Sequence, residues 1–511
     1  MIKSPNPSPF KQSTQHLIFF LLLLPILTAH TLSLAEIPAG LYLDESSIGF
    51  NAVSLMETGR DEHGALLPIY PKSVGDYKNP IFIYASAVVL KVLGISEFNL
   101  RFTSVIFYLC ALALTLLLTK RLFEDNPIIR LYTLVAFGFL PMFFTISRIA
   151  FEVITQLAWT SASLLLIWMV FHWSSAKRET LNALICGFVL GTATYTYSTG
   201  RLLSFLGMGV LWVVYLKRLS FKKLSLVTAT FLGALIPFFV FSIRNPGAIT
   251  SRFSTLSYWS EELSLADKFV IFFQNYLTYF SPRFLLFQGD SNLRHSTGFG
   301  GIIFASVYLL AMIGITGIVI RKKFNRFNIF LFISLLLSPV AAALISEGTP
   351  HALRSMTLGF YIFLFSCYGV REFFSIENRW ARTLALTGIA LLLLVEIAAY
   401  QTDYFLAYPA RSVPAMGCQG FQSSLQFAID KHPSKIIFLS KPREMYANMQ
   451  FYSLLVDNPE DIPLAWDNRV KPKPNQCILY HIQNERELAP YPDPYEEFDS
   501  RGVIKARCYL P

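Results

Sequence analysis

The chain is dominated by apolar stretches that are each long enough, or nearly so, to cross a lipid bilayer. A bilayer core of about 30 Å is spanned by about 20 helical residues, and a helix satisfies its own backbone hydrogen bonds in lipid. Eleven such stretches are residues 17–35, 99–119, 131–146, 149–173, 180–197, 202–216, 224–243, 301–320, 328–345, 356–371 and 383–400. They predict an α-helical polytopic membrane protein. A soluble globule is excluded, because 53% of the residues are hydrophobic and only 15% are charged.

Basic residues gather at alternate ends of these stretches. Clusters at 120–121, 177–178, 217–223 and 321–323 follow the second, fourth, sixth and eighth stretches. Because lysine and arginine accumulate in cytoplasmic loops, these ends face the cytoplasm and the opposite ends face outward. The net charge of +10 therefore reflects membrane orientation and does not indicate nucleic acid binding.

The first stretch has two interpretations. Lys3 and Lys11 precede it and favour a retained helix with a cytoplasmic N-terminus. The residues 33–35, Ser-Leu-Ala, resemble the cleavage site of a signal peptide, which is the alternative.

The first outer loop, residues 36–80, is the longest polar interval in the first half of the chain. A helical pattern begins at Asp44 and Glu45 and stops at Gly59, so Asp44 is predicted to be the N-cap and Glu45 to lie in the first turn. Adjacent helical residues point about 100° apart, so the two acids would face different partners. The simplest alternative is that Asp44 only caps the helix and Glu45 only complements its dipole. The short apolar segment 81–93 is predicted to be an interfacial helix.

Further ionisable and aromatic side chains lie at the predicted outer ends of other stretches. Such residues are costly near a membrane and need a reason to be there. They are Arg148, Glu152, Tyr195, Tyr197, Arg201, Asp290, Arg294, His295, Glu347, His351 and Arg354. Taken singly, Arg148 and Glu152 could form a structural ion pair, Arg201 and Arg354 could be interfacial anchors, and the histidines could be ordinary loop residues. Together they indicate a site on the outer face.

Residues 401–511 differ in character from the 1–400 transmembrane region and predict a small α/β domain outside the cytoplasm. Strand-like runs occupy 435–440, 477–481 and 503–509, and helical patterns occupy 419–431 and 443–455. Of the three cysteines in this region, Cys477 and Cys508 lie in strand-like runs, so we expect them to form a disulfide and Cys418 to stay free. The chain has no Cys-x-x-Cys or His/Cys spacing typical of a structural zinc site.

Five segments together resemble the GT-C glycosyltransferases, in particular the protein O-mannosyltransferase family (glycosyltransferase family 39) and the transferases of aminoarabinose to lipid A. The segments are PAGLYLDESSIGFNAVSLMETGRDEHG, GDYKNPIFIY, SRIAFE, LFQGDSNLRHSTGFG and PHALRS. The resemblance covers roughly residues 15–400. YKNP departs from the YKPP often seen in such proteins.

The resemblance implies a polyprenyl-phosphate sugar as donor and an acid in the first outer loop as the central catalytic group. The catalytic residues would be Asp44 and Glu45. The donor phosphate would bind Lys78, Arg148, Arg201 and Arg294. Other substrate contacts would come from Tyr77, Tyr197, Asp290, His295, His351 and Arg354. A divalent metal is associated with the aminoarabinose branch, where Glu152 would match a ligand, whereas the mannosyltransferases are not thought to need one.

The sequence thus predicts a multi-pass inner-membrane glycosyltransferase that works on the outer face. A stable phosphate leaving group needs cations, and the acceptor hydroxyl needs a base; the acceptor could be a protein, a lipid or a glycan. No glycine-rich phosphate loop follows a strand, so a nucleotide-sugar site is not expected. The alternatives are a transporter or flippase of a lipid-linked sugar and a non-catalytic scaffold.

Overall fold

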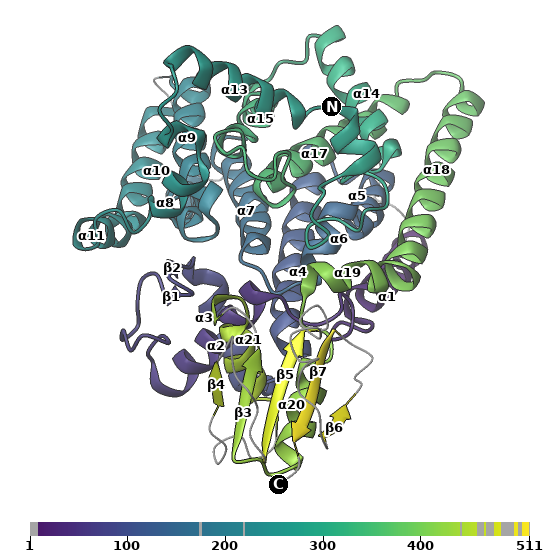
Figure 1. The fold of residues 1–511 in the computed structure, drawn as a ribbon. Helices are drawn as coiled ribbons and strands as arrows, with labels where there is room; N and C mark the ends of the chain where they lie inside the picture. The colour runs from purple at the N-terminus through teal and green to yellow at the C-terminus, as the bar shows by residue number, and fades with distance from the viewer. Residues whose placement is uncertain are drawn as a thin grey trace.

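The computed structural model describes residues 9–172, 176–217, 220–439, 442–456, 464–466, 475–481, 495–498 and 503–509. Most of these residues are helical, and one five-stranded sheet is formed near the C-terminus. Figure 1 shows the long helices gathered in one body, with the sheet and the first outer loop together at one end of it.

Every predicted apolar stretch falls on a helix or on a helix that is interrupted. The helices of this region are α1 (Pro9–Thr31), α4 (Glu97–Leu122), α5 (Pro127–Phe139), α6 (Pro141–Ser147), α7 (Val153–His172), α8 (Ala176–Thr192), α9 (Ser198–Tyr215), α10 (Phe221–Ala234), α11 (Ile236–Arg244), α14 (Ala305–Ile320), α15 (Arg326–Leu337), α16 (Val340–Ala343), α17 (Met356–Phe373) and α18 (Arg379–Leu406). The long outer loop adds α12 (Ser251–Leu256), η3 (Tyr258–Ser260), α13 (Leu265–Thr278) and the π-helical turn η4 (Arg283–Gln288).

The number of membrane spans is the first point on which sequence and structure differ. Among the described residues, seven helices are long and apolar enough to cross a membrane, or eight if α5 and α6 form one bent span. The prediction of eleven is therefore not confirmed. The apolar part of α1 and the whole of α14 are shorter apolar helices, and α8 has 17 residues with a charged first turn.

The break between α5 and α6 shapes the outer face. The two helices meet at an angle of 56°. Pro141 is the first residue of α6, where its missing N–H costs no helical hydrogen bond but prevents α5 from continuing. After α6 the chain runs without helix through residues 149–152 before α7 begins. This non-helical segment therefore lies against the first outer loop, and Asn79 of that loop can donate hydrogen bonds to Glu152.

The first outer loop folds as α2 (Leu43–Thr58), the hairpin of β1 (Lys72–Ser73) and β2 (Asp76–Tyr77), and α3 (Pro80–Leu93). The predicted N-cap was wrong: Tyr42 is the N-cap, and Asp44 and Glu45 both lie in the first turn. The predicted end was right, because Gly59 adopts the left-handed conformation with φ of 70° that glycine accepts most readily. Helix α3 confirms that the segment after the loop is helical.

The C-terminal unit contains α19 (Tyr408–Met416), α20 (Phe421–Asp430), α21 (Pro442–Ser453) and the sheet. The sheet strands are β3 (Lys435–Leu439), β4 (Leu464–Trp466), β5 (Gln476–His481), β6 (Tyr495–Phe498) and β7 (Ile504–Tyr509), in the order β4-β3-β5-β7-β6. Strands β4, β3 and β5 are parallel, whereas β7 is antiparallel to both of its neighbours. Helix α18 continues to Leu406, so the domain boundary predicted at residue 400 falls inside a helix; the division into two domains stays a prediction.

The predicted disulfide is confirmed. Cys477 of β5 and Cys508 of β7 are directly paired in register and are joined, while Cys418 is free and buried.

The C-terminal unit packs directly on the first outer loop. Helix α21 lies against α2. A Cβ at Gly49 would come within 2.5 Å of the Phe451 ring, so glycine is needed for this close approach. The Tyr452 hydroxyl accepts a hydrogen bond from the Leu41 backbone N–H at 3.1 Å. The sheet and the α2 region must therefore lie on the same side of the membrane.

This packing predicts the outcome of reporter fusions. Alkaline phosphatase is active only outside the cytoplasm. The Cys477–Cys508 disulfide indicates an oxidising compartment, so we expect the reporter to be active both in the loop near Gly64 and after Leu455. A fusion after Lys323, in a basic cluster, serves as the cytoplasmic control and should be inactive. Activity at only one of the two outer positions would contradict the arrangement.

Candidate active site

Asp44 and Lys78 form an ion pair at the surface of the first outer loop. Asp44 comes from the first turn of α2, and Lys78 lies between the β-hairpin and α3. The Lys78 Nζ is 2.5 Å from Asp44 Oδ1; the lysine side chain is buried and the aspartate is partly exposed. Burial alone would raise the pKa of Asp44, but Lys78, with Arg252 and Arg294 further away, outweighs burial and lowers it. Asp44 is therefore an ionised carboxylate with an exposed edge.

Glu45 faces a different partner, as the sequence predicted. Its side chain is fully buried and paired with the equally buried Arg101 of α4, with Nε to Oε1 at 3.0 Å and Nη2 to Oε2 at 3.1 Å. It also accepts hydrogen bonds from the backbone N–H groups of Ala150 and Tyr42. With no exposed oxygen, Glu45 is placed to hold structure. We therefore do not retain it as a group that touches substrate.

Glu152 is held by Asn79. Its two carboxylate oxygens accept from the Asn79 backbone N–H at 2.6 Å and from the Asn79 side-chain amide at 3.0 Å. Arg201 in turn donates to Asn79 Oδ1 at 3.0 Å. Burial raises the pKa of Glu152, and Lys78 and the hydrogen bonds from Asn79 oppose that rise. The three side chains form a continuous polar chain beside Lys78.

The Glu152 position does not fit a metal ion. Both of its oxygens already accept hydrogen bonds from Asn79. The positive charge that interacts with Glu152 and Asp44 is the Lys78 ammonium, whose pKa these two acids raise against the opposing effect of burial. A lysine thus occupies the place that a cation bound between the two acids would need. We derive no step through a metal there.

Two arginines, Arg252 and Arg294, act on the charge of Asp44 from separate segments, and a third, Arg354, acts on Tyr197. Arg252 of α12 pairs with Asp76 at 3.0 Å, and Arg294 lies over the Tyr42 ring at 5.2 Å. Arg354 donates to the carbonyl of Glu347 at 2.7 Å, and its charge reaches Tyr197 together with that of Arg252. Sequence reasoning missed Arg252, because it lies in the middle of a long loop with no motif around it. Its pairing with the hairpin next to Lys78 is visible only in three dimensions.

Arg148 is not placed to bind a phosphate, contrary to the sequence prediction. Its guanidinium is fully buried and donates to the Tyr404 hydroxyl and to the carbonyls of four residues that end α1 or follow it: Ala29, Leu32, Ser33 and Ile37. All three guanidinium nitrogens have partners. Nor does Arg148 pair with Glu152, so the structural ion pair considered for these two residues is also absent.

The predicted site residues Tyr197, Tyr77 and Arg201 contact neighbouring side chains and backbone groups. Tyr197 precedes α9 and packs against Phe151, and burial raises its pKa to about 12. The rings of Tyr77 and Phe241, a residue of α11, pack edge to face. Arg201 donates to the carbonyl of Ile249 and lies over the Tyr70 ring, but its buried Nε has no hydrogen-bond partner.

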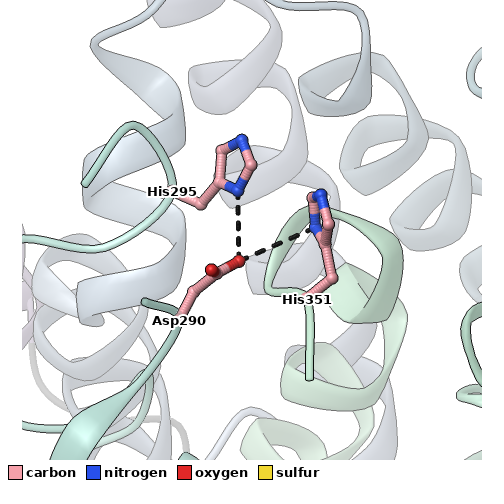
Figure 2. A group of neighbouring side chains, drawn as sticks. All are labelled: Asp290, His295 and His351. Carbon is pink, nitrogen blue, oxygen red and sulfur yellow. Dashed lines mark hydrogen bonds and ion pairs between the residues drawn. The ribbon is translucent and has the colours of Figure 1, made fainter. Parts of the chain in front are cut away.

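Asp290, His295 and His351 come together in a second cluster, which Figure 2 shows. Two separate loops supply them. His295 Nδ1 lies 3.1 Å and His351 Nδ1 lies 3.7 Å from the same oxygen, Asp290 Oδ2. The three side chains thus lie together, and their role in substrate binding stays a prediction.

A cavity lies inside the helical body, next to the site. One of its lining residues, Gln156, is one helical turn beyond Glu152 and accepts a hydrogen bond from Thr199. The walls come from α7, α9, α15 and α17 and combine apolar residues such as Leu164, Phe330 and Leu337 with a few hydroxyl groups.

Comparison with known proteins identifies the fold. No family model matches the chain, and no curated protein matches it in sequence. The structure is similar to ArnT from Cupriavidus metallidurans bound to undecaprenyl phosphate, with 13% identity over 96% of this chain and 97% of that one and a TM-score of 0.56. It is also similar to the oligosaccharyltransferase from Archaeoglobus fulgidus in complex with zinc and sulfate, with 12% identity over 95% and 72% of the two chains and a TM-score of 0.55.

Both solved structures have the GT-C fold. The chain therefore has the fold that its sequence predicted, that of a multi-pass membrane protein of the GT-C type.

The buried Glu45–Arg101 pair predicts a selective loss of stability. Glu45→Gln leaves the charge of Arg101 unbalanced in the interior, and removal of one partner of a buried pair costs about 3–5 kcal/mol. The purified variant should unfold at a clearly lower temperature or denaturant concentration than the wild type in the same detergent. Glu57→Gln, at an exposed position of α2, is the matched control. An equal loss of stability in both variants, or no loss of stability in either, would contradict a structural role for Glu45.

Proposed function

We propose that this protein transfers a sugar from a polyprenyl-phosphate donor to a hydroxyl acceptor at the outer face of the inner membrane. The observation that carries the proposal is the ionised, partly exposed Asp44, paired with Lys78 and approached by Arg252 and Arg294, in a chain with the GT-C fold. A carboxylate among cations suits the reaction, which needs a base for the acceptor and positive charge for a phosphate leaving group.

The cations would bind the donor phosphate. Arg252, Arg294 and Lys78 all act on the charge of Asp44, so an anion held by them would lie next to that carboxylate. Phosphate is bound well by guanidinium and ammonium groups through short, charge-assisted hydrogen bonds. We include Arg354 among these cations because its charge, like that of Arg252, acts on Tyr197. Arg148 is assigned no part in phosphate binding, because its guanidinium is buried and all three of its nitrogens donate within the protein. Arg201, whose buried Nε has no partner, stays a candidate for phosphate binding.

The Asp44–Lys78 pair suggests how donor binding would prepare the base. An ion-paired carboxylate with a lowered pKa is a weak base. A phosphate bound beside Lys78 would share the ammonium and so weaken its hold on Asp44. The carboxylate would then gain basicity only when the donor is present, which limits wasteful reaction with water.

In the transfer step, the acceptor oxygen attacks the anomeric carbon of the sugar. As this bond forms, the bond from that carbon to the phosphate oxygen breaks, and its electron pair leaves on the phosphate. The proton of the acceptor hydroxyl passes to Asp44. A single displacement of this kind inverts the configuration at the anomeric carbon. The arginines stabilise the charge that grows on the leaving phosphate.

The lipid chain of the donor would enter the helical body. A mainly apolar cavity of about 80 Å³, lined by α7, α9, α15 and α17, begins one turn from Glu152 and has room for only a short part of that chain. That location suits an isoprenoid chain whose phosphate lies at the outer face. A transporter would be expected to bind near the membrane midplane, whereas the charged groups described here gather around one outer loop, which favours a reaction. An assay with a panel of polyprenyl-phosphate sugars would identify the sugar.

The phosphate assignment predicts weaker donor binding in two variants. In Arg252→Met or Arg294→Met, loss of one charge-assisted contact worth about 1.5–3 kcal/mol should lower affinity for a polyprenyl phosphate about 10- to 100-fold. Binding can be measured by titration of the detergent-solubilised protein. Arg283→Met, at an exposed position of the same long loop, should bind like the wild type. Unchanged binding in both test variants would show that the phosphate lies elsewhere.

The general-base assignment predicts that Asp44→Asn separates binding from transfer. Asparagine preserves the shape of the side chain but cannot take up the acceptor proton, so the transfer rate should fall about 10²- to 10⁴-fold. The variant should fold, and should bind donor at least as well as the wild type because Lys78 is released from its pair. The test is a transfer assay run beside the binding titration. Transfer at nearly the wild-type rate would exclude Asp44 as the base.

A further inference from the structure

The Asp290, His295 and His351 cluster has a geometry that hydrogen bonding alone does not explain. Asp290 follows the π-helical turn η4 and Gly289, whose φ is 65°, and His295 comes five residues later in the same loop. His351 comes from the turn between α16 and η5 (Leu353–Ser355). In Figure 2 both imidazole rings present one nitrogen to the Asp290 carboxylate.

The backbone fixes the Asp290 carboxylate before any ligand is considered. Its Oδ1 accepts from the Asn292 N–H at 2.8 Å, and its Oδ2 accepts from the Ala352 N–H at 2.8 Å. The two imidazole rings are stacked with centroids 4.4 Å apart. Asp290 and His295 are buried, and His351 is nearly so. The backbone thus holds the Asp290 carboxylate in place between the two loops that supply the cluster.

One nitrogen in the cluster has no hydrogen-bond partner. His351 Nδ1 is buried, and its 3.7 Å separation from Asp290 Oδ2 is too long for a hydrogen bond. A buried nitrogen that remains unpaired is costly. Asp290 Oδ2 already accepts from Ala352 and lies within hydrogen-bond distance of His295, so it does not provide a hydrogen-bond partner for His351 Nδ1.

A metal ion would satisfy all three groups. The facing oxygen and nitrogen atoms lie within 4.8 Å of one another, in the only group of three or more His, Cys, Asp or Glu side chains with this property among the described residues. Ligands bound tetrahedrally at about 2.0–2.1 Å lie about 3.4 Å apart. The separations of 3.1 and 3.7 Å bracket that value, so small shifts would place three ligands around one ion.

We propose that Asp290, His295 and His351 bind a zinc ion through Asp290 Oδ2 and the two Nδ1 atoms. Imidazole nitrogens favour zinc and similar transition metals over Mg²⁺ and Ca²⁺, which prefer oxygen ligands. The arginines nearby disfavour cations that are held mainly by charge, and this also favours a metal with strong bonds to nitrogen. Three protein ligands leave a fourth position for water or another oxygen.

The bound ion would clamp the two loops that carry phosphate-binding arginines. Arg294 lies between Asp290 and His295 in sequence, and Arg354 follows His351 by three residues. The metal would hold both arginines in position beside Tyr42 and Tyr197. Only this consequence rests on the proposed transfer reaction; metal binding does not.

The test is metal analysis of the full-length protein, purified in detergent with an affinity tag that contains no histidine. One equivalent of zinc is added to the protein, and unbound zinc is then removed by exchange into metal-free buffer. We expect about one zinc per chain to be retained. His295→Ala and His351→Ala should lose it. His63→Ala, which removes an exposed histidine of the first outer loop, is the matched control and should retain zinc. In parallel, Co²⁺ added to the wild type should give the visible absorption of a tetrahedral site.

Each result decides the proposal. Retention of zinc by the wild type and the His63 variant, with loss in both cluster variants, supports the site. No retained zinc and no tetrahedral Co²⁺ spectrum in the wild type overturns it. Retention by the His351 and His295 variants also overturns it, because the ion is then bound elsewhere. If a cluster variant fails to fold, the Co²⁺ spectrum of the wild type still decides whether a tetrahedral site exists.

Discussion

Two buried guanidinium groups fix the backbone on which the candidate site is built. Arg101 donates to the carbonyls of residues 34, 35, 38 and 40, and Arg148 donates to those of residues 29, 32, 33 and 37. The chain between α1 and α2 forms no regular ladder, so several of these carbonyls depend on the two guanidinium groups for a partner, and a buried carbonyl without one costs about 1–3 kcal/mol. Glu45 balances the charge of Arg101. The start of α2, and with it Asp44, is thereby held in one place relative to α4 and to the loop before α7.

Three carboxylates near this point have different tasks because their surroundings differ. Glu45 is fully buried against a guanidinium and serves packing. Glu152 is buried and hydrogen-bonded to a neutral amide, and burial raises its pKa against the opposing effects of Lys78 and of these hydrogen bonds. Asp44 is paired with an ammonium yet partly exposed. Only Asp44 combines a negative charge at neutral pH with access from outside. Environment, and not residue type, therefore separates the candidate base from the two structural acids.

Sequence patterns predicted what depends on neighbours along the chain. Hydrophobic length located the helices, Gly59 marked the end of α2, and strand-like runs located Cys477 and Cys508. The errors concern contacts between distant segments. Arg148 looked like a phosphate ligand, because nothing in SRIAFE indicates that α1 ends beside it and offers it carbonyl groups. Arg252 was missed for the converse reason, since its approach to Asp44 depends on how a loop without motifs folds back. The number of spans is not confirmed, because several of the apolar stretches form helices that are short or interrupted.

The departure from the YKPP pattern has a physical explanation in this structure. Asn79 stands where a proline is often found, and it uses its backbone N–H and its amide to bind both oxygens of Glu152. A proline has no N–H and no amide and could make neither bond. Asn79 also accepts from Arg201, so its side chain joins a cation and an acid that would otherwise be separate. Lys78 precedes Asn79 directly, and the Glu152 charge contributes to holding its ammonium beside Asp44. The asparagine thus provides hydrogen bonds, in place of the stiffness of a proline, directly next to Lys78.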